Sequence, residues 1–347
     1  MRAITVLPGQ AHTARVDEVA EPAPSEHTLL VDALALGICG TDLEITSGQY
    51  GWAPPGRERL ILGHESLGRV RSAPAGSGFA VGDHVAGIVR RPDPVPCANC
   101  AAAEWDFCSN GRYTERGIKE LDGYGAERWR VEPGFAVKVD PALGIAGVLL
   151  EPTSVVAKAW EVAERLGART VWQPRTVLIT GAGPIGLLAA LLGVQRRLDV
   201  HVLDRVTDGP KPQLVRALGA SYHHGELEQA GPPPDLVLEC TGVDELVFRA
   251  MAHLRPNGVI CLTGVSSAAR KITVNLGALN REIVLENNIA VGSVNANRRH
   301  YQAAADALAR ADRKWLDALI TRRVPLSRFA EALERRPGDV KTIVTFD

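Results

Sequence analysis

The sequence predicts an α/β protein with two parts, a β-rich lobe followed by a doubly wound parallel sheet. Short alternating strands and Gly/Pro turns fill residues 1–150. A glycine-rich turn between a strand and a helix follows a change of texture near residue 151. Beyond it, apolar strands alternate with helices, which is typical of a parallel sheet covered on both faces.

Length and composition agree with two domains and limit the class of function. The chain has 347 residues, of which 46% are hydrophobic and 23% charged, enough for two sizeable cores. The formal net charge of −1 favours neither nucleic acid nor an anionic membrane surface as a partner. The N-terminus shows no secretory or transit pattern, and the apolar run 185–194 is too short to span a bilayer. We therefore expect a cytoplasmic protein.

Strands and helices are expected in the following order. In the β-rich lobe, placed at 1–155, strands are expected at 27–36, 65–73 and 83–91. A helix at 153–167 leads into the parallel-sheet domain, placed at 156–295. That domain is expected to hold strands at 200–204, 233–242 and 259–265, with helices at 211–221 and within 249–257, the second followed by Gly258. A C-terminal segment, 296–347, is expected to be helical before a final strand, KTIVTF.

A glycine-rich loop opens the parallel-sheet domain. Gly181, Gly183 and Gly186, with Pro184 and Ile185 between them, follow a strand and precede a helix. The first glycine permits a tight turn, the second lets the backbone approach a pyrophosphate, and the third lets the helix pack on the strand. Free N–H groups at the helix N-terminus suit the phosphates. The pattern predicts a dinucleotide cofactor, with a structural turn in another α/β fold as the alternative.

Asp204 ends the second strand of that domain, 23 positions after Gly181. A carboxylate there suits the ribose hydroxyls of NAD and repels the additional phosphate of NADP. Arg205 and Lys211 follow closely, and they either bind that phosphate or belong to an ordinary solvated loop. We favour NAD, keep NADP open, and count Thr241 as a further candidate cofactor contact.

Cys39, His64 and Glu151 are candidate ligands of a catalytic zinc ion. Each is flanked by glycine, proline or small residues, as expected at turns. Thiolate, imidazole and carboxylate bind zinc well, and three protein ligands leave a fourth position for the substrate. Glu65 is an alternative or additional ligand, and Thr41 is a candidate proton relay. Spacing alone does not bring these residues together, and each by itself is also compatible with a structural role.

A second candidate metal site lies on a cysteine loop. Cys97, Cys100 and Cys108 lie within twelve residues, which is the spacing of metal ligands rather than of scattered core thiols. A loop with four cysteines would need another at position 94, which is Pro94. Asp93 or water supplies the fourth ligand, or the loop holds no metal.

Longer strings resemble the zinc-containing medium-chain dehydrogenase/reductase superfamily over nearly the whole chain. The shared strings are GICGTD (37–42), LGHESLGRV (62–70), VGDHV (81–85), the cysteine loop, GAGPIG and VKTIVTF (340–346). Three further strings resemble the archaeal-type glucose 1-dehydrogenases within it, namely YTERGIKELDGYGAE (113–127), LLEPTSVVAKAW (149–160) and GSVNANRRHY (292–301).

The resemblance implies a GroES-like catalytic domain, completed by the C-terminal segment, and a Rossmann domain, with the active site in the cleft between them. The implied reaction is zinc-dependent oxidation of an aldose, glucose first, at C1 to the lactone, with hydride transfer to NAD(P)⁺. The implied assembly is a homodimer or homotetramer. The implied positions are zinc at Cys39, His64 and Glu151 with Glu65 nearby, proton relay at Thr41, sugar contacts at Thr41, Glu115, Glu151 and His300, and a nicotinamide contact at Asn295.

The chain departs from the resemblance in two places. Pro94 replaces the first cysteine of the loop, and Asp204-Arg205-Val206 stands where the NADP-using glucose enzymes have a small residue followed by two basic ones. The main rival activity is zinc-dependent oxidation of another polyol or secondary alcohol. A metal-free reductase or a non-enzymatic NAD-binding protein is disfavoured because the candidate zinc ligands are all present.

Overall fold

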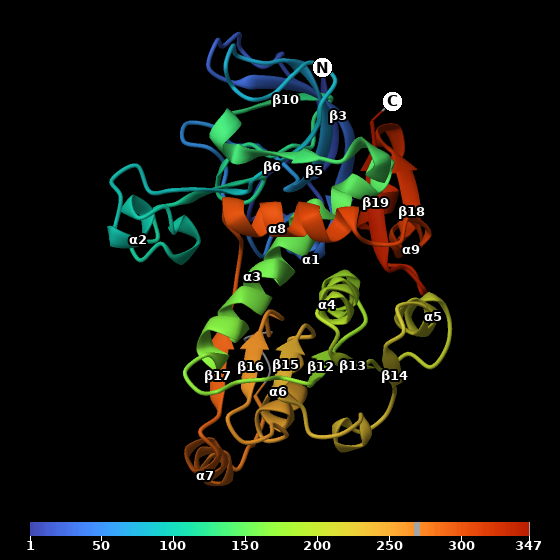
Figure 1. Cartoon of the computed structure of the whole chain (residues 1–347). Helices are drawn as coiled ribbons and strands as arrows, with labels where there is room; N and C mark the ends of the chain where they lie inside the picture. Colours follow the sequence, from blue (N-terminus) through green and yellow to red (C-terminus); the bar gives the residue numbers. More distant parts are fainter. Residues whose placement is uncertain (267–270, 347) are drawn as a thin grey trace. The chain divides into compact units, whose positions relative to one another are not determined.

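The computed structural model describes residues 1–266 and 271–346, which divide into two compact units (Figure 1). Unit 1 comprises Met1–Ser154 and Asn295–Asp347, and unit 2 comprises Val155–Val294. These divisions lie one residue from the expected boundaries 155/156 and 295/296. Asp347, the last residue of the expected C-terminal segment, lies outside the described residues.

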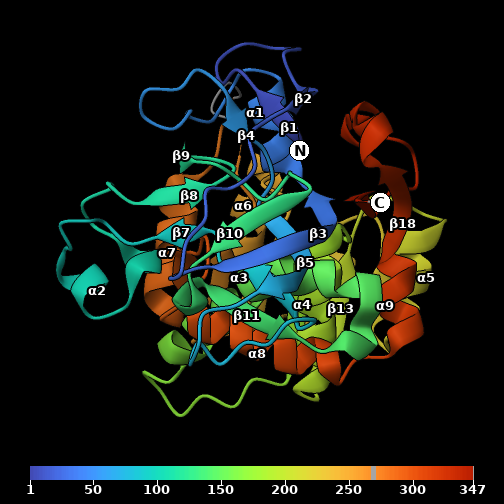
Figure 2. The same cartoon turned by 90° about the horizontal axis from the view of Figure 1, so that it is seen from above.

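Unit 1 is built on a seven-stranded sheet. The strands run in the order β11(Ala136–Val139), β6(His84–Gly87), β5(Glu65–Ser72), β3(Leu29–Ile38), β19(Lys341–Thr345) and β18(Ile320–Pro325), with β10(Arg128–Val131) also paired to β3. Figure 2 shows β10, β3 and β5 side by side. Two small sheets accompany it: β2(Arg15–Glu18), β1(Arg2–Val6) and β4(Leu60–Ile61) form one, and β7(Arg90–Arg91), β8(Thr114–Arg116) and β9(Glu120–Leu121) form the other.

The long strand β3 explains why this lobe folds as a sheet. Buried and half-buried residues alternate along most of it, as the pleat requires, and Leu29, Val31 and Leu36 are at most 1% exposed. They join one apolar core with residues of β1, β5, β6 and β10. Short helices fill the connections: α1(Gly40–Thr46), α2(Ala98–Ala101), α8(Arg298–Ala309) and α9(Arg313–Leu319).

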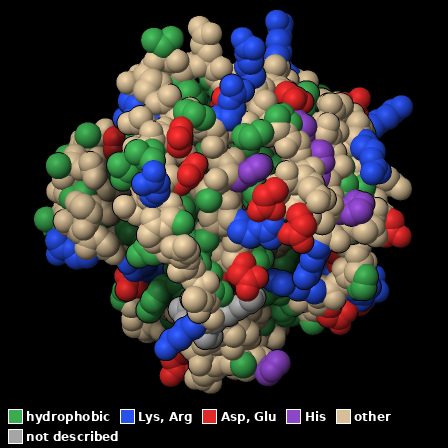
Figure 3. Space-filling model, turned by 90° about the horizontal axis from the view of Figure 1, so that it is seen from below, with side chains coloured by type: hydrophobic (Ala, Val, Ile, Leu, Met, Phe, Trp, Pro, Cys, Tyr) green, Lys and Arg blue, Asp and Glu red, His purple; other side chains and the backbone are tan. Residues whose placement is uncertain are grey.

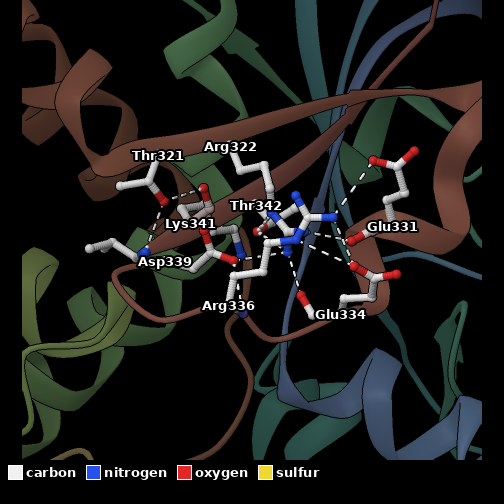
Figure 4. A network of polar contacts seen from close by, with 9 residues as sticks. Thr321, Arg322, Glu331, Glu334, Arg336, Asp339, Lys341 and Thr342 are labelled. Atoms are coloured by element: carbon white, nitrogen blue, oxygen red, sulfur yellow. Dashed lines mark hydrogen bonds and ion pairs between the residues drawn. The ribbon is translucent and has the colours of Figure 1, made fainter.

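The C-terminal segment completes the sheet of unit 1. Strand β19 lies between β3 and β18, antiparallel to the first and parallel to the second. Figure 4 shows the polar contacts that fix this segment: Arg322 donates to the Glu331 carbonyl oxygen (2.6 Å) and pairs with Asp339 (2.9 Å). Thr321 Oγ1 accepts from the Val340 N–H (2.9 Å). These contacts set the position of the next residue, Lys341.

Unit 2 is a six-stranded parallel sheet. The order is β14(Ser221–His223), β13(Asp199–Leu203), β12(Thr176–Thr180), β15(Leu236–Glu239), β16(Val259–Leu262) and β17(Ile289–Gly292). Numbered along the chain, this is 3-2-1-4-5-6, the order of the doubly wound dinucleotide-binding fold. Its helices are α4(Pro184–Gln195), α5(Pro210–Ala217), α6(Asp244–Met251) and α7(Leu276–Glu286), and α3(Leu150–Gly167) leads into it. The order reverses next to β12, the strand that precedes the glycine-rich loop.

Most predicted elements are present, and the differences have local causes. The predicted strand 83–91 is two strands, because Ile88 and Val89 lie between β6 and β7. The predicted helix 211–221 ends at Ala217, and Gly219, with φ +81, turns the chain into β14. The predicted helix within 249–257 is wrong in its bounds, because α6 spans Asp244–Met251. The C-terminal segment is not helical throughout up to KTIVTF, because β18 intervenes.

Two surface properties bear on possible partners. Figure 3 shows Lys and Arg side chains interspersed with Asp and Glu on one face, in keeping with the net charge of −1. One helical run, Pro141–Gly167, reaches membrane-spanning length and hydropathy, but 78% of its apolar window is buried within the protein. A core helix of a water-soluble fold has the same composition.

Candidate active site

The thiol of Cys39 is held at the junction of a strand and a helix. Strand β3 ends at Ile38, and Cys39 adopts an extended conformation as the N-cap of α1. The Asp42 carboxylate reaches back to accept a hydrogen bond from the Cys39 N–H (2.9 Å). This reciprocal capping fixes the first turn of the helix and the direction of the thiol.

His64 and Glu65 stand beside Cys39. Gly63, with φ +95, makes a turn before β5, and a Cβ on it would collide with the Leu36 side chain. The Cys39 Sγ lies 3.0 Å from His64 Nε2, and the other ring nitrogen faces Asp42 Oδ1 at 3.6 Å. One ligand atom from each of Cys39, His64 and Glu65 lies within 4.8 Å of the other two.

Glu151, in the first turn of α3, lies outside that group of three but interacts with it electrostatically. Burial raises the pKa of the Glu151 carboxyl to about 7, against the opposing effect of His64. Burial by itself would lower the pKa of His64. The negative charges of Cys39 and Asp42, with a smaller effect of Glu151, outweigh it and raise that pKa well above its usual value.

Lys341 contributes a buried positive charge. Its ammonium pairs with Glu65 and donates to the Ile38 carbonyl oxygen (3.0 Å), and the residue is 1% exposed. Burial would lower the pKa of Lys341, but the charges of Glu65 and Cys39 raise it overall. The ion pair connects β19 to β5 across β3.

These residues fit a divalent metal ion. Sulfur, imidazole nitrogen and carboxylate oxygen converge from two segments, the start of α1 and the start of β5, and they are donors that zinc prefers. The negative groups exceed the nearby positive ones, so the cluster favours a cation. Asp42 would orient the His64 ring through the nitrogen that does not face Cys39, a usual outer contact of a metal-bound imidazole.

Glu115 is the buried centre of a second polar group in unit 1. It lies opposite Arg90 in the β7–β8 pair and is 6% exposed. Its Oε1 accepts from Arg90 Nε (3.0 Å) and from Asn295 Nδ2 (2.7 Å). Arg90 also donates to the Asp106 carbonyl oxygen (3.1 Å). One carboxylate oxygen is thus held by two donors, while Oε2 has no partner within the described chain.

The remaining predicted substrate residues lie at the starts of helices. Thr41 is in the first turn of α1, two residues after Cys39. His300 is 1% exposed in the first turn of α8, and its Nδ1 accepts from the Asn297 N–H (3.0 Å). A sugar contact from His300 therefore requires the other ring nitrogen, Nε2. Asn295, predicted as a nicotinamide contact, lies against Glu115, and its φ of +62 is the left-handed conformation that asparagine tolerates.

The glycine-rich loop in unit 2 has the shape that the sequence predicts. Gly181 has φ +90, and a Cβ on Gly186 would collide with the Gly181 carbonyl oxygen, so both positions require glycine. A Cβ on Gly183 would meet nothing within 4 Å. The chain's own packing does not demand glycine there, and the free space adjoins the N-terminus of α4, where Pro184 and Ile185 begin the helix.

Asp204 lies against that loop. Its carboxylate accepts from the Ala182 N–H (2.6 Å) and pairs with Lys211 (3.3 Å). Burial would raise its pKa, but these two contacts outweigh it and hold the pKa below the usual value. Arg205 is exposed. Thr241 also reaches the loop, because a Cβ on Gly181 would lie 2.9 Å from its methyl group.

The three cysteines of the second cluster lie together. One ligand atom of each of Cys97, Cys100 and Cys108 lies within 4.8 Å of the others. Hydrogen bonds from Ser109 and from the Cys100 N–H lower the pKa of Cys97 to about 5, whereas burial raises that of Cys100 to about 11. Asp93 is outside this group, and its two oxygens accept from the Val95 N–H and from Asn110 Nδ2, each at 2.8 Å.

The sequence alone did not indicate four residues that support these sites. Asp42 and Lys341 contact the candidate metal ligands, Arg90 holds Glu115, and Glu239 accepts from the Thr241 and Gly242 N–H groups. Asp42 could have been found from its spacing, since an acid three residues after an N-cap is a capping signal. Lys341 and Arg90 act through tertiary contacts that no local pattern reports. Glu239 bonds to residues two and three positions later, but no motif in the sequence marks an acid at the end of that strand.

Comparison with known proteins assigns the family. The family model "Glucose dehydrogenase C-terminus" matches residues 144–346, and "Alcohol dehydrogenase GroES-like domain" matches residues 25–141. A glucose 1-dehydrogenase of Methanocella arvoryzae is 37% identical, with 99% of each chain covered. Glucose 1-dehydrogenase 1 of Caldivirga maquilingensis is 40% identical, covering 99% of this chain and 98% of the other.

A solved structure agrees over the same length. The glucose dehydrogenase of Haloferax mediterranei, in complex with NADP, zinc and gluconolactone, superposes with a TM-score of 0.92 at 31% identity. The match covers 100% of this chain and 99% of that one. The sequence identity over nearly the whole chain, the two family models and the structural match all lead to the same assignment. The chain belongs to the glucose 1-dehydrogenase family, within the zinc-containing medium-chain dehydrogenase/reductase superfamily.

Proposed function

We propose that this protein oxidises glucose at C1 to the lactone, using zinc and transferring hydride to NAD(P)⁺. The convergence of Cys39, His64 and Glu65 within 4.8 Å carries the proposal. Relatives named glucose 1-dehydrogenase at 37–40% identity over nearly the whole chain support the choice of sugar. The complex of the Haloferax mediterranei enzyme with NADP, zinc and gluconolactone supports the reaction and its product.

Cys39, His64 and one or both of Glu65 and Glu151 would hold the zinc. A zinc ion there supplies Lewis-acid chemistry that lowers the pKa of the C1 hydroxyl. Asp42 holds the Cys39 backbone and faces the His64 ring, so it maintains the geometry of two ligands. Thr41 is placed in the same helical turn as Asp42, and its hydroxyl is suited to pass the substrate proton toward solvent.

Glu115 would orient the sugar through its unpartnered oxygen. Arg90 and Asn295 fix Oε1, so Oε2 offers a charged acceptor in a defined direction. A sugar that lacks the matching hydroxyl would leave this buried carboxylate with one oxygen unsatisfied, which penalises the wrong substrate. Glu151 and His300 are further proposed sugar contacts.

The cofactor would bind at Gly181–Gly186 with the ribose near Asp204. The carboxylate favours NAD, and its contact with Ala182 places it beside the loop. Lys211 and the exposed Arg205 provide positive charge for the phosphate of NADP. We propose that both cofactors are used, with Asp204 setting a preference for NAD.

For the cysteine loop, we propose a second zinc with water as the fourth ligand. Three sulfurs lie close enough, and the thiol of Cys97 is already biased toward the thiolate that binds metal. Asp93 is a poorer fourth ligand because hydrogen bonds occupy both of its oxygens. This ion would stabilise the loop rather than take part in the chemistry.

We further propose that the protein is a cytoplasmic homodimer that associates through unit 2. Helix α7 has no buried residue, and its Leu276, Val284 and Leu285 are 59–65% exposed. Strand β17 is the edge of the described parallel sheet, next to β16 only. An exposed apolar helix that leads along the chain into an edge strand is suited to a second copy related by a two-fold axis. Val284→Asp should give monomers by light scattering, and an unchanged mass would contradict this interface.

A matrix of initial rates tests the proposed activity. Glucose, galactose, xylose, polyols and secondary alcohols are each assayed with NAD⁺ and with NADP⁺, before and after metal removal by a chelator. We expect kcat/KM to be highest for an aldose, activity to fall on chelation, and zinc to restore it. Preference for a polyol or a secondary alcohol would replace glucose as the substrate, and full activity in metal-free protein would refute the mechanism.

A further inference from the structure

Unit 1 exposes two adjacent aromatic side chains that its fold does not use. Tyr50 is 40% and Trp52 46% exposed, and of the aromatic residues that the structure describes only Phe107 is comparably exposed. Their rings pack edge to face with centroids 5.1 Å apart. Neither the Tyr50 hydroxyl nor Trp52 Nε1 has a hydrogen-bond partner within the described chain. Exposed aromatic surface of this kind is costly in water, so it suggests a ligand.

The backbone holds the pair in a fixed position. Gly51, between the two aromatics, has φ +96, and a Cβ on it would lie 3.1 Å from the Ile45 side chain. The Trp52 N–H donates to the Ile118 carbonyl oxygen (2.9 Å), and the Trp52 carbonyl accepts from the Glu120 N–H (3.0 Å). The rings are therefore presented by a tight turn that is paired with residues 118–120.

That turn adjoins the candidate sugar carboxylate. Partial burial raises the pKa of the Tyr50 hydroxyl, and the negative charge of Glu115 is the next contribution. Residues 115–119 form a compact loop in which the Glu115 carbonyl accepts from the Lys119 N–H (2.9 Å). A Cβ on Gly117 would collide with the Gly63 backbone, so this loop packs directly against the residue before His64.

The aromatic pair, the turn that holds it and the Glu115 carboxylate together match the two kinds of surface that a pyranose presents. The ring edge carries hydroxyls, which a buried carboxylate with one free oxygen recognises. The ring faces carry C–H groups, which pack favourably on aromatic surface. Glu115 provides the first kind of surface. Tyr50 and Trp52 provide the second, from a turn whose backbone is paired with residues 118–120 of the loop that begins at Glu115.

We propose that Tyr50 and Trp52 form a stacking face for the sugar ring and that they determine specificity for cyclic substrates. This inference rests on the proposed function, since it names the residues that would bind the ring of the same aldose. Stacking takes place on the ring face and not at C1. It is therefore made equally in the ground state and in the transition state, and it should act on KM rather than on kcat.

The test compares variants of the zinc-loaded holoenzyme with glucose at saturating NAD⁺. We expect Trp52→Ala to raise the KM for glucose about tenfold and Tyr50→Ala about fivefold, with kcat within about twofold of the parent. Trp52→Phe should restore KM to within about threefold, because it keeps an aromatic face. The KM for NAD⁺ should not change in any variant.

Val81→Ala is the matched control, because Val81 is an apolar residue of unit 1 that is 73% exposed and far along the chain from both loops. Its kinetics should equal those of the parent. An unchanged KM for glucose in both Trp52→Ala and Tyr50→Ala would overturn the stacking face, as would a loss confined to kcat. Failure of the parent enzyme to oxidise any aldose would refute the proposed function instead, so the two failures are distinguishable.

Discussion

The two thiol-containing clusters of unit 1 differ in ligand chemistry and in how the chain assembles them. Cys39, His64 and Glu65 combine sulfur, nitrogen and oxygen, and they come together through the pairing of β3 with β5, in which Gly37 lies opposite Glu65. The second cluster has three sulfurs within twelve residues, on a loop with the four-residue helix α2. One cluster depends on the whole sheet, whereas the other depends on local turns.

This difference indicates which of the two clusters is suited to catalysis. The first is surrounded by groups that tune it, since Asp42 contacts two of its members and Lys341 balances the charge of the third. The second has hydrogen bonds that favour thiolate at Cys97 but no comparable charged partner for the other two thiols among the described residues. We infer that the first would be catalytic and the second structural, and four predictions test that division.

Removing one thiol from each cluster should have the most unequal effects. We expect Cys39→Ala to lower kcat at least about 1,000-fold, because a Lewis acid contributes several kcal/mol to such a transition state. Cys108→Ala should leave kcat within about threefold. Initial rates at saturating sugar and cofactor measure both, and cofactor titration should show unchanged binding in both variants. Equal losses of kcat would contradict the division into catalytic and structural sites.

The acids next to the two clusters provide the second contrast. Asp42→Asn should lower zinc affinity or kcat by about 10- to 100-fold, as is usual for a residue that orients a metal-bound histidine. Asp93→Asn should leave both within about twofold, because Asp93 binds Val95 and Asn110 rather than a thiol side chain. Metal content by mass spectrometry and kcat measure the effects, and a large loss in Asp93→Asn would instead make that acid a ligand.

The same contrast explains what the sequence could predict. The cysteine loop and the glycine loop are local patterns, so their spacing alone predicted a candidate metal site and a nucleotide site. The structure brings the three thiols together and gives Gly181–Gly186 the expected turn, and the ligands themselves stay predictions. Cys39 and His64 are 25 positions apart, so their chemistry made them candidate ligands but their spacing could not bring them together, and the family resemblance was needed to place them at one ion.

Lys341 and Arg90 show why the remainder was not predicted. The Lys341 ammonium reaches the Ile38 carbonyl across 303 positions, and a lysine in a strand pattern indicates an exposed side chain rather than a buried ion pair. Arg90 faces Glu115 only because β7 pairs with β8, and strands of two and three residues give too little periodicity to predict. Helix α7 was also missed, since it buries none of its residues and so carries no clear apolar stripe.

Removing a thiol from the cysteine loop should affect the stability of the protein more than its activity. We expect Cys100→Ser to lower the free energy of unfolding by about 1–3 kcal/mol, because it places a polar group at a position only 8% exposed and weakens any metal site there. Activity at 25 °C should remain. Thermal unfolding followed by circular dichroism measures the change. If the melting temperature is the same for the parent and the variant, with and without added zinc, the loop has no structural role.

Supplying a fourth thiol should have the smallest effect on activity and would sharpen the comparison most. Pro94 occupies the position that a Cys-x₂-Cys-x₂-Cys-x₇-Cys loop would fill with cysteine. We expect Pro94→Cys to leave kcat within about twofold and to make the second zinc several-fold slower to lose in a chelator, because four thiolates close a tetrahedral site. Pro94→Ala, which removes the proline without adding a ligand, is the control. If Pro94→Cys and Pro94→Ala lose zinc at the same rate, the loop geometry does not direct a side chain at position 94 toward the three sulfurs, and water remains the better fourth ligand.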